Sequence, residues 1–498
     1  MKQFLWLGSV LFLFVICVGC GQTFRPIIIP NPAQFPNPQA AHTVVTVSDN
    51  GAVSAGYAMV IDVSGDADVS QKSAGLHPVH AVQQAANQVL VISQAVAGVP
   101  PPPSGCVVTV GNTQDNVCPT LTKLNFSGTV ISAVSTLTLP PSSGANFVAT
   151  TETGQAYISL PTYVPDPVNN PTVIVPSIYV VNTTANSFVA TIPVGTGPTA
   201  DPYTVAETPD GTKLYVGNHG DGTVDGFNTK DRSSRTISGS FVAPVWISAR
   251  SDNQRVYVLN GNGNGVLSTL DTHLTAGPDS VIDSSINVPG ATYMWYDMIL
   301  NRLYIPYGGQ LAILDVSQSV PAQLVNSPIT ISTLSPALRS STDPCATTST
   351  ELPLTVASVT SLPDGSRAYV GSYYIDNADN VCPQVTVITT SNNTVKTTVP
   401  IPGFPEATNP NTLYYVPACT TTRDTGLANA NGFRMTMGAA GDSTRAYLAS
   451  CDGGNVNLID TTLDAYVLDV PAPYSARAPI PPSAENPPQS PVFMIAGP

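Results

Sequence analysis

A short strand built around a tyrosine recurs along the chain, and this repeat constrains the fold more than any other feature of the sequence. Two copies begin with the same turn, since Pro209–Gly211 precedes Tyr215 and Pro363–Gly365 precedes Tyr369 with equal spacing. Pro-Asp-Gly turns of this kind are typical of hairpins. Including weaker copies, seven anchor residues align along the chain: Leu90, Tyr157, Tyr215, Tyr257, Tyr304, Tyr369 and Tyr447.

Strand patterns also dominate the rest of the sequence after residue 41. They are short β-branched and aromatic runs separated by Gly, Asn, Asp and Pro, and a helical spacing of apolar residues occurs only near Val82–Val96. The two shortest gaps between anchors, 42 and 47 residues, match the length of one propeller blade. The longer gaps imply insertions of about 15 to 35 residues. The sequence therefore predicts an all-β fold, a β-propeller of four-stranded antiparallel blades.

A second half-repeat follows several anchors and consists of a strand, a polar turn and another strand. It occurs at Val180–Gly195, Val385–Val395 and Val456–Val467. Together with the Pro-Asp-Gly turn and the Tyr-Val strand, this pattern resembles the YVTN family of β-propeller repeats over roughly residues 43–471. The chain departs from the family in its irregular repeat lengths and in a glycine near the position of the family's asparagine. The resemblance implies a closed propeller, usually of seven blades.

The two ends of the repeat region predict how the ring closes. Residues 43–75 contain the later strands of a blade without a first strand, whereas Pro491–Ile495 has the pattern of a lone first strand. Pairing of these strands would remove two exposed sheet edges. This arrangement gives eight blades, and seven remains the alternative because it is the usual number in the family.

The first residues predict export. Lys2 precedes an apolar run from Phe4 to Gly19, which has the length of a signal-peptide core. The run ends at Cys20 in a pattern that resembles the bacterial lipobox, although Cys17 stands where leucine is usual. We expect a signal peptide at 1–19, a lipidated Cys20 with a proline-rich tether at 20–42, and the propeller at 43–498. A lipid anchor would place the protein in the cell envelope, on the periplasmic or surface face. An ordinary secretory signal is the alternative, and under either interpretation the protein is exported.

The charge balance excludes one class of partner. Lys and Arg number 18 against 32 Asp and Glu, which gives a formal net charge of −14. A duplex-binding protein needs cationic side chains to replace counterions along the phosphates, so we expect no nucleic-acid partner.

Six cysteines lie beyond the signal region, and export places them where disulfides persist. None has the spacing of a zinc knuckle or a thioredoxin-like motif. We expect three bridges that stabilise insertions, and six cysteines allow fifteen connectivities. Proximity in sequence favours Cys106 with Cys118, Cys345 with Cys382, and Cys419 with Cys451, but only the first pair is local enough for the sequence to decide its pairing.

Two loops contain the candidate ligand-binding residues. One is a tight polar turn with His219 and Asp221, and the other is a segment that contains Tyr373, Tyr374, Asp376 and Asp379. The tyrosine pair, with Trp246 and Trp295 elsewhere, has the chemistry of an aromatic platform for a sugar or peptide, although aromatic residues often pack between blades. Acidic oxygens near Asp376, and those of Asp62, Asp66 and Asp68, would suit calcium, but both segments lack the calcium-loop pattern. His77 and His80 lack a third ligand nearby, so we expect no metal site and no cofactor.

No nucleophile elbow or other catalytic motif is present in the sequence. We therefore expect a lipid-anchored, non-catalytic binding or scaffolding module that uses its loops to bind a protein or polysaccharide. Two alternatives stay open: a hydrolase, because some propellers similar to this family act as lactonases, and a structural surface-layer protein.

Overall fold

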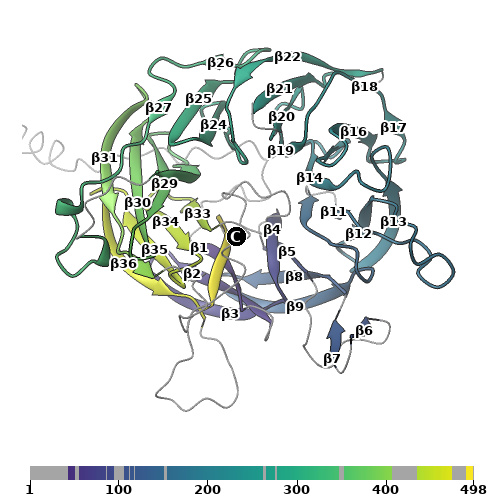
Figure 1. Cartoon of the computed structure of the whole chain (residues 1–498), viewed down its shortest axis with the longest axis horizontal. Coiled ribbons are helices and arrows are strands. Elements are labelled where there is room, and N and C mark those ends of the chain that lie inside the picture. The colour runs from purple at the N-terminus through teal and green to yellow at the C-terminus, as the bar shows by residue number, and fades with distance from the viewer. Residues whose placement is uncertain are drawn as a thin grey trace, which may run out of the picture.

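The computed structural model describes residues 43–496 with gaps at 51–54, 86, 95–105, 111–112, 117, 151–153, 262–264, 275–276, 347–352, 406–433 and 474–488. Eight four-stranded blades form a closed ring (Figure 1). The inner strands of such a ring surround a central channel. The chain is all-β as predicted, and the described residues contain only two short 3₁₀ turns, η1 (Pro336–Leu338) and η2 (Pro344–Ala346). Of the segment with helical spacing, Val82–Ala85 belongs to a strand and Gln88–Ser93 forms another, while residues 86, 95 and 96 lie outside the described residues.

Each blade is an antiparallel meander, described here from the innermost strand outward. Blade 1 contains β37 (Ser490–Ala496), β1 (Thr43–Asp49), β2 (Gly56–Asp62) and β3 (Ala67–Gly75). Blade 2 contains β4 (Pro78–Ala85), β5 (Gln88–Ser93), β8 (Thr120–Ser127) and β9 (Val130–Thr138), with an inserted hairpin of β6 (Val107–Val110) and β7 (Thr113–Asn116). Blade 3 contains β10 (Phe147–Thr150), β11 (Gln155–Leu160), β12 (Ser177–Asn182) and β13 (Ser187–Pro193). Blade 4 contains β14 (Pro202–Glu207), β15 (Lys213–Asn218), β16 (Thr223–Asn228) and β17 (Ser234–Arg235).

The remaining four blades carry some additional short strands. Blade 5 contains β19 (Pro244–Ala249), β20 (Arg255–Asn260), β21 (Val266–Asp271) and β22 (Asp279–Asn287), with β18 (Ile237–Ser238) pairing in parallel to β22. Blade 6 contains β23 (Trp295–Asp297), β24 (Arg302–Tyr307), β25 (Gln310–Asp315), β26 (Ala322–Gln323) and β27 (Ile329–Thr330). Blade 7 contains β28 (Thr355–Ser361), β29 (Arg367–Ile375), β30 (Asn380–Thr389), β31 (Thr394–Pro400) and β32 (Phe404–Pro405). Blade 8 contains β33 (Met435–Ala439), β34 (Arg445–Ser450), β35 (Asn455–Asp460) and β36 (Ala465–Pro471).

The ring closes through the two ends of the chain, as the sequence predicts. Strand β37 pairs antiparallel with β1, and Val45 faces Ile495 while Thr46 faces Met494. The first strand of blade 1 therefore comes from the C-terminal end and the other three from the N-terminal end. This pairing decides the count in favour of eight blades.

The tyrosine anchors lie on the second strand of six blades and form part of the core. All six side chains are almost completely buried, because each one packs within an interface between neighbouring blades. Eight apolar clusters account for the eight blade interfaces. Burial of apolar area between blades, at about 25 cal/mol per Å², is the main stabilising contribution in such a ring.

A basic residue two positions before several of these tyrosines links each blade to the next one. Lys213 of blade 4 donates to the Leu274 carbonyl of blade 5 at 2.7 Å, and Arg302 of blade 6 donates to the Thr390 carbonyl of blade 7 at 2.7 Å. Arg367 and Arg445 do the same with carboxylates, at 2.7 Å to Asp464 and 3.0 Å to Asp66 respectively. Much of the small set of cations in this chain is thus used to join blades.

The meander places the connections of every blade on two different faces. Turns between first and second strands and between third and fourth strands lie at one end, which we call the short-turn face. Turns between second and third strands, and the connections between blades, lie at the other end, which we call the loop face. The described strands that flank each long insertion have their insertion-side ends at the loop face, and β1 starts at the short-turn face.

Candidate functional site

A β-bulge recurs on the inner strands where they begin, at the loop face. In blade 5, Pro244 pairs with Asn260 and Trp246 with Leu259, so the register of the pairing shifts by one residue at Val245. The same shift occurs in blade 2 at His80, and in blades 1, 4 and 7. A bulge redirects the side chain that follows it, and here it acts beside the central channel.

Five ring-bearing side chains at this end of the inner strands form a continuous series of contacts. His80 stacks on Phe147 with ring centroids 3.9 Å apart and also meets Phe493 at 4.8 Å. Trp246 meets Phe147 edge-on at 5.7 Å and Tyr293 at 4.9 Å. These residues come from blades 1, 2, 3, 5 and 6, and we call them the aromatic arc.

The contact between Phe147 and Trp246 shows where the arc lies. Blade 4 separates blade 3 from blade 5 in the ring, so these two rings meet along the channel side of blade 4. The arc therefore lines the loop-face mouth of the channel. Trp246, Tyr293 and Phe493 keep part of their surface exposed.

His80 is the one titratable imidazole of the arc, and its contacts restrict its protonation. The side chain is 5% exposed, and its Nδ1 accepts the Val148 N–H at 3.4 Å. Nδ1 therefore carries no proton in this arrangement. His80 packs here as a ring between Phe147 and Phe493.

A pocket adjoins the end of the arc between blades 6 and 7. Its volume is about 120 Å³, and its walls include Tyr293, Tyr307, Gly308, Thr292 and Thr355. Burial raises the pKa of both tyrosines above the usual value, so their hydroxyls stay protonated at neutral pH. Tyr293 thus belongs to both the arc and the pocket.

The residues expected from the first polar turn lie in blade 4. His219 contacts the Tyr203 ring at 5.6 Å, and its Nδ1 is 3.6 Å from the Asp201 carboxylate. Asp221 accepts the Thr196 N–H at 2.7 Å, which holds two loop-face connections together. The turn therefore belongs to the loop face.

The residues expected from the second segment lie in blade 7, three blades away. Tyr373 and Tyr374 are 4% and 2% exposed, so they pack in the interior and do not present an exposed platform. Asp376 is also buried and accepts the N–H groups of Ala378 at 2.8 Å and Asn380 at 2.9 Å. Asp379 is exposed at the tip of the same turn. The structure does not bring this group together with His219 and Asp221.

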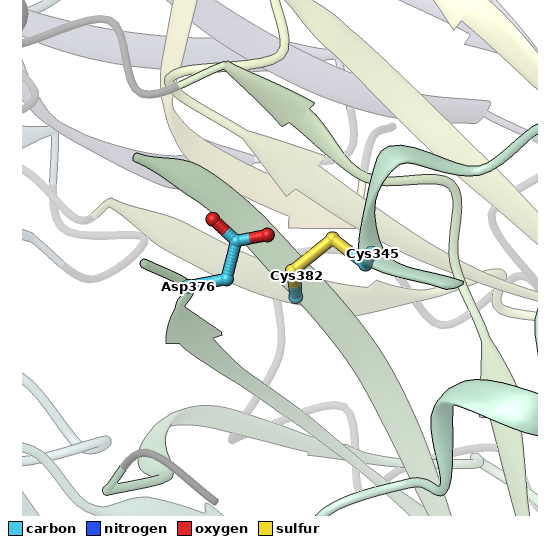
Figure 2. Close-up of side chains that lie close together, drawn as sticks. All are labelled: Cys345, Asp376 and Cys382. Carbon is cyan, nitrogen blue, oxygen red and sulfur yellow. A yellow bond between two sulfur atoms is a disulfide. The ribbon is translucent and has the colours of Figure 1, made fainter. Parts of the chain in front are cut away.

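Only one group of three possible metal ligands lies close together among the described residues, namely Cys345, Asp376 and Cys382. Figure 2 shows that the two sulfur atoms form a disulfide beside the Asp376 carboxylate. Disulfide sulfurs are not thiolate ligands, so this group is not a metal centre in the oxidised protein. Among the other acidic residues considered for calcium, Asp66 pairs with Arg445, and Asp62 accepts from Ser64.

Two of the expected disulfides are confirmed. Cys106 joins Cys118, and Cys345 joins Cys382. Cys451 is also disulfide-bonded, while its expected partner Cys419 lies outside the described residues. The second bridge ties the connection between blades 6 and 7 to a strand of blade 7.

The sequence analysis did not group the five residues of the aromatic arc, although the sequence contains a pattern that relates three of them. Three of its members follow the same dipeptide, since Pro-Val precedes His80, Trp246 and Phe493. Proline suits the start of such a strand because it has no N–H to donate to the ladder. Aligning the inner strands on Pro-Val would have grouped these rings.

The comparisons with known proteins bear on the fold. No family model matches the chain, and no curated protein matches it. Among the described residues, no helix is long and apolar enough to cross a membrane.

Several solved structures are similar in shape. Apo AztD from Citrobacter koseri is 9% identical with a TM-score of 0.50, and the match covers 92% of this chain and 98% of that one. The dihydro-heme d1 dehydrogenase NirN, solved in complex with DHE, is 12% identical with a TM-score of 0.52, and the match covers 88% of this chain and 75% of that one. At these identities the likeness establishes the fold alone: the chain is an eight-bladed β-propeller.

Proposed function

We propose that this protein is a lipid-anchored binding module of the cell envelope, and that its loop face binds a protein or glycan partner. The observation that carries the proposal is the aromatic arc with its adjoining pocket at the mouth of the channel. Partly exposed aromatic rings around a concave site are typical of binding sites, because they bury much area with little loss of side-chain entropy. The long connections are all on the same face, where loops on a rigid scaffold commonly carry function.

The proposed anchor is compatible with this orientation. Cys20 and the tether precede β1, which starts at the short-turn face. A tether attached there leaves the loop face directed away from the membrane. Replacing Cys20 with serine should move the protein from the membrane fraction to the soluble fraction. Continued membrane association of that variant would contradict the anchor.

Site-specific photocrosslinking tests which face binds. A photoreactive amino acid at Thr199 or Ala378, both exposed on the loop face, should give crosslinked adducts in cells that express the full chain. The matched positions Ala185 and Thr462, exposed on the short-turn face, should give none. Adducts from the short-turn positions only, or from neither face, would overturn the proposal.

A further inference from the structure

The pocket between blades 6 and 7 has a size that limits what can enter it. Its volume of about 120 Å³ is close to the ~150 Å³ of an engineered cavity that holds one benzene ring. The pocket therefore suits a single five- or six-membered ring. A longer ligand would have to continue outside it, and the aromatic arc begins at the pocket wall through Tyr293.

The walls of the pocket carry no ionic charge. The residues that line it include no Asp, Glu, Lys, Arg or His. The arc adds only His80, whose Nδ1 accepts a backbone hydrogen bond. Moving a charged group out of water without a counter-charge costs several kcal/mol. The site therefore disfavours phosphates, carboxylates, ammonium groups and metal ions, and it fits an uncharged ligand.

The same walls combine aromatic faces with hydroxyl groups. Tyr293 and Tyr307 provide both, and Thr292 and Thr355 add two more hydroxyls. The turn at Gly308 has a positive φ of 45°, and a side chain added there would meet no atom within 4 Å, so the backbone is uncovered. A sugar ring has apolar C–H faces and a rim of hydroxyls, which match aromatic faces and hydroxyl or backbone partners respectively.

We propose that this pocket binds one sugar residue of an uncharged polysaccharide, and that the aromatic arc supports the neighbouring residues of the glycan chain. This assignment rests on the loop-face binding function proposed above and names its ligand class. A proline or aromatic side chain of a peptide would fit the volume. However, such a side chain carries at most one polar group, whereas a sugar ring presents several hydroxyls to the hydroxyl-bearing walls of the pocket.

Intrinsic fluorescence provides a direct measurement of binding. Trp246 and Trp295 are the only tryptophans in residues 43–498, and the Trp246 ring lies 4.9 Å from Tyr293. The purified full chain would be titrated with neutral oligosaccharides of two to six glucose, mannose, galactose or N-acetylglucosamine residues. We expect a saturable change in emission with at least one series, and loss of most of this change in Trp246→Phe.

Three tyrosine variants locate the site. Tyr307→Ala removes a wall and should weaken binding at least about tenfold, whereas Tyr307→Phe keeps the ring and should lose less. Tyr179→Ala is the matched control, because Tyr179 is a half-buried tyrosine of blade 3 that packs on Phe188 at 4.7 Å, away from the pocket. The Tyr179→Ala variant should bind the oligosaccharide with the affinity of the wild type. Thermal unfolding would verify that all variants fold.

The outcomes separate this assignment from the broader function. Sugar binding that Tyr307→Ala leaves unchanged would overturn the pocket as its location. No response to any oligosaccharide, or displacement of the signal only by proline- or tyrosine-rich peptides, would overturn the sugar assignment. If the loop-face crosslinks still formed in either case, the binding function would stand, whereas absence of both would overturn both proposals.

Discussion

At the scale of single residues, the few charges of this chain are concentrated in buried clusters. Asp279 is fully buried and accepts from Arg235 at 2.8 Å and from the Tyr215 hydroxyl at 2.8 Å, with Lys213 3.6 Å away. Burial and the nearby carboxylate together raise the pKa of Tyr215, so it stays a hydrogen-bond donor. This carboxylate of blade 5 therefore holds three groups of blade 4 and so joins the two blades.

Asp279→Ala should be among the most destabilising substitutions in the ring. It would leave two cations without their shared carboxylate, and removing one partner of a buried ion pair costs about 3–5 kcal/mol. The measurement is the thermal midpoint of Asp279→Ala compared with that of Asp283→Ala. Asp283 is a half-exposed aspartate on the same strand. Equal midpoints for the two variants would show that the cluster contributes nothing.

The contact between His77 and Asp49 predicts a pH dependence. Burial disfavours the charged imidazole, but the hydrogen bond and charge of the buried Asp49 outweigh it and raise the pKa of His77 above 6.5. The contact should therefore stabilise the fold fully below about pH 6.5, and this stabilisation should disappear as pH rises through the raised pKa.

The test compares the wild type with His77→Asn, because asparagine tolerates the positive φ of 52° at this position. The wild type should exceed the variant in thermal midpoint by more at about pH 5.5 than at about pH 9. A difference that grows with pH would contradict the sign of this interaction.

At the scale of strands, the tyrosine-bearing second strands could be predicted from sequence, whereas among the inner strands only the one at Pro491–Ile495 was identified as such. Tyr215 and Tyr369 follow recognisable turns. A tyrosine recurs on six of the second strands because each of these interfaces buries one large aromatic side chain. Five of the eight inner strands contain a bulge, so the alternation of inward and outward side chains fails at residues such as Trp246. Long-range packing, which the sequence does not encode locally, brings such rings together. His219 and Tyr373 have similar local chemistry but lie three blades apart.

The disulfide between Cys345 and Cys382 should protect one connection and leave the ring unchanged. Arg339 in that connection is buried and donates to the Ile401 carbonyl at 2.7 Å and the Pro383 carbonyl at 2.9 Å. Replacing both cysteines with alanine should expose the peptide bond after Arg339 to trypsin. The thermal midpoint of the whole ring should stay nearly unchanged. Mass spectrometry of limited digests identifies the cut.

The bridge between Cys106 and Cys118 supplies the control for this experiment. It lies in the inserted hairpin of blade 2, so its double alanine variant should keep Arg339 protected. Cleavage after Arg339 in both variants, or in neither, would contradict a local role for the bridge between Cys345 and Cys382.

At the scale of the whole molecule, the ring has eight interfaces between blades. Only a closed ring covers both faces of every blade. The count could not be decided from the repeat alone, because the resemblance implied seven blades while the terminal strands implied eight. Pairing of residues 441 to 452 positions apart in sequence carries no local signal other than the missing first strand. The pairing of β1 with β37 resolves it.

Deleting residues 489–498 should therefore destabilise the entire ring. The deletion removes the inner strand of blade 1. Val492 and Met494 of this strand are almost completely buried, and nothing replaces their contacts. It also removes the Gln489 side chain, which accepts the Tyr57 N–H at 3.0 Å. Each lost apolar side chain is worth about 1.5–3 kcal/mol, so the thermal midpoint should fall by about 5 °C or more and aggregation should increase. Deleting residues 24–38 of the expected tether should leave the midpoint nearly unchanged, and a silent C-terminal deletion would mean that the other seven blades maintain the ring without this strand.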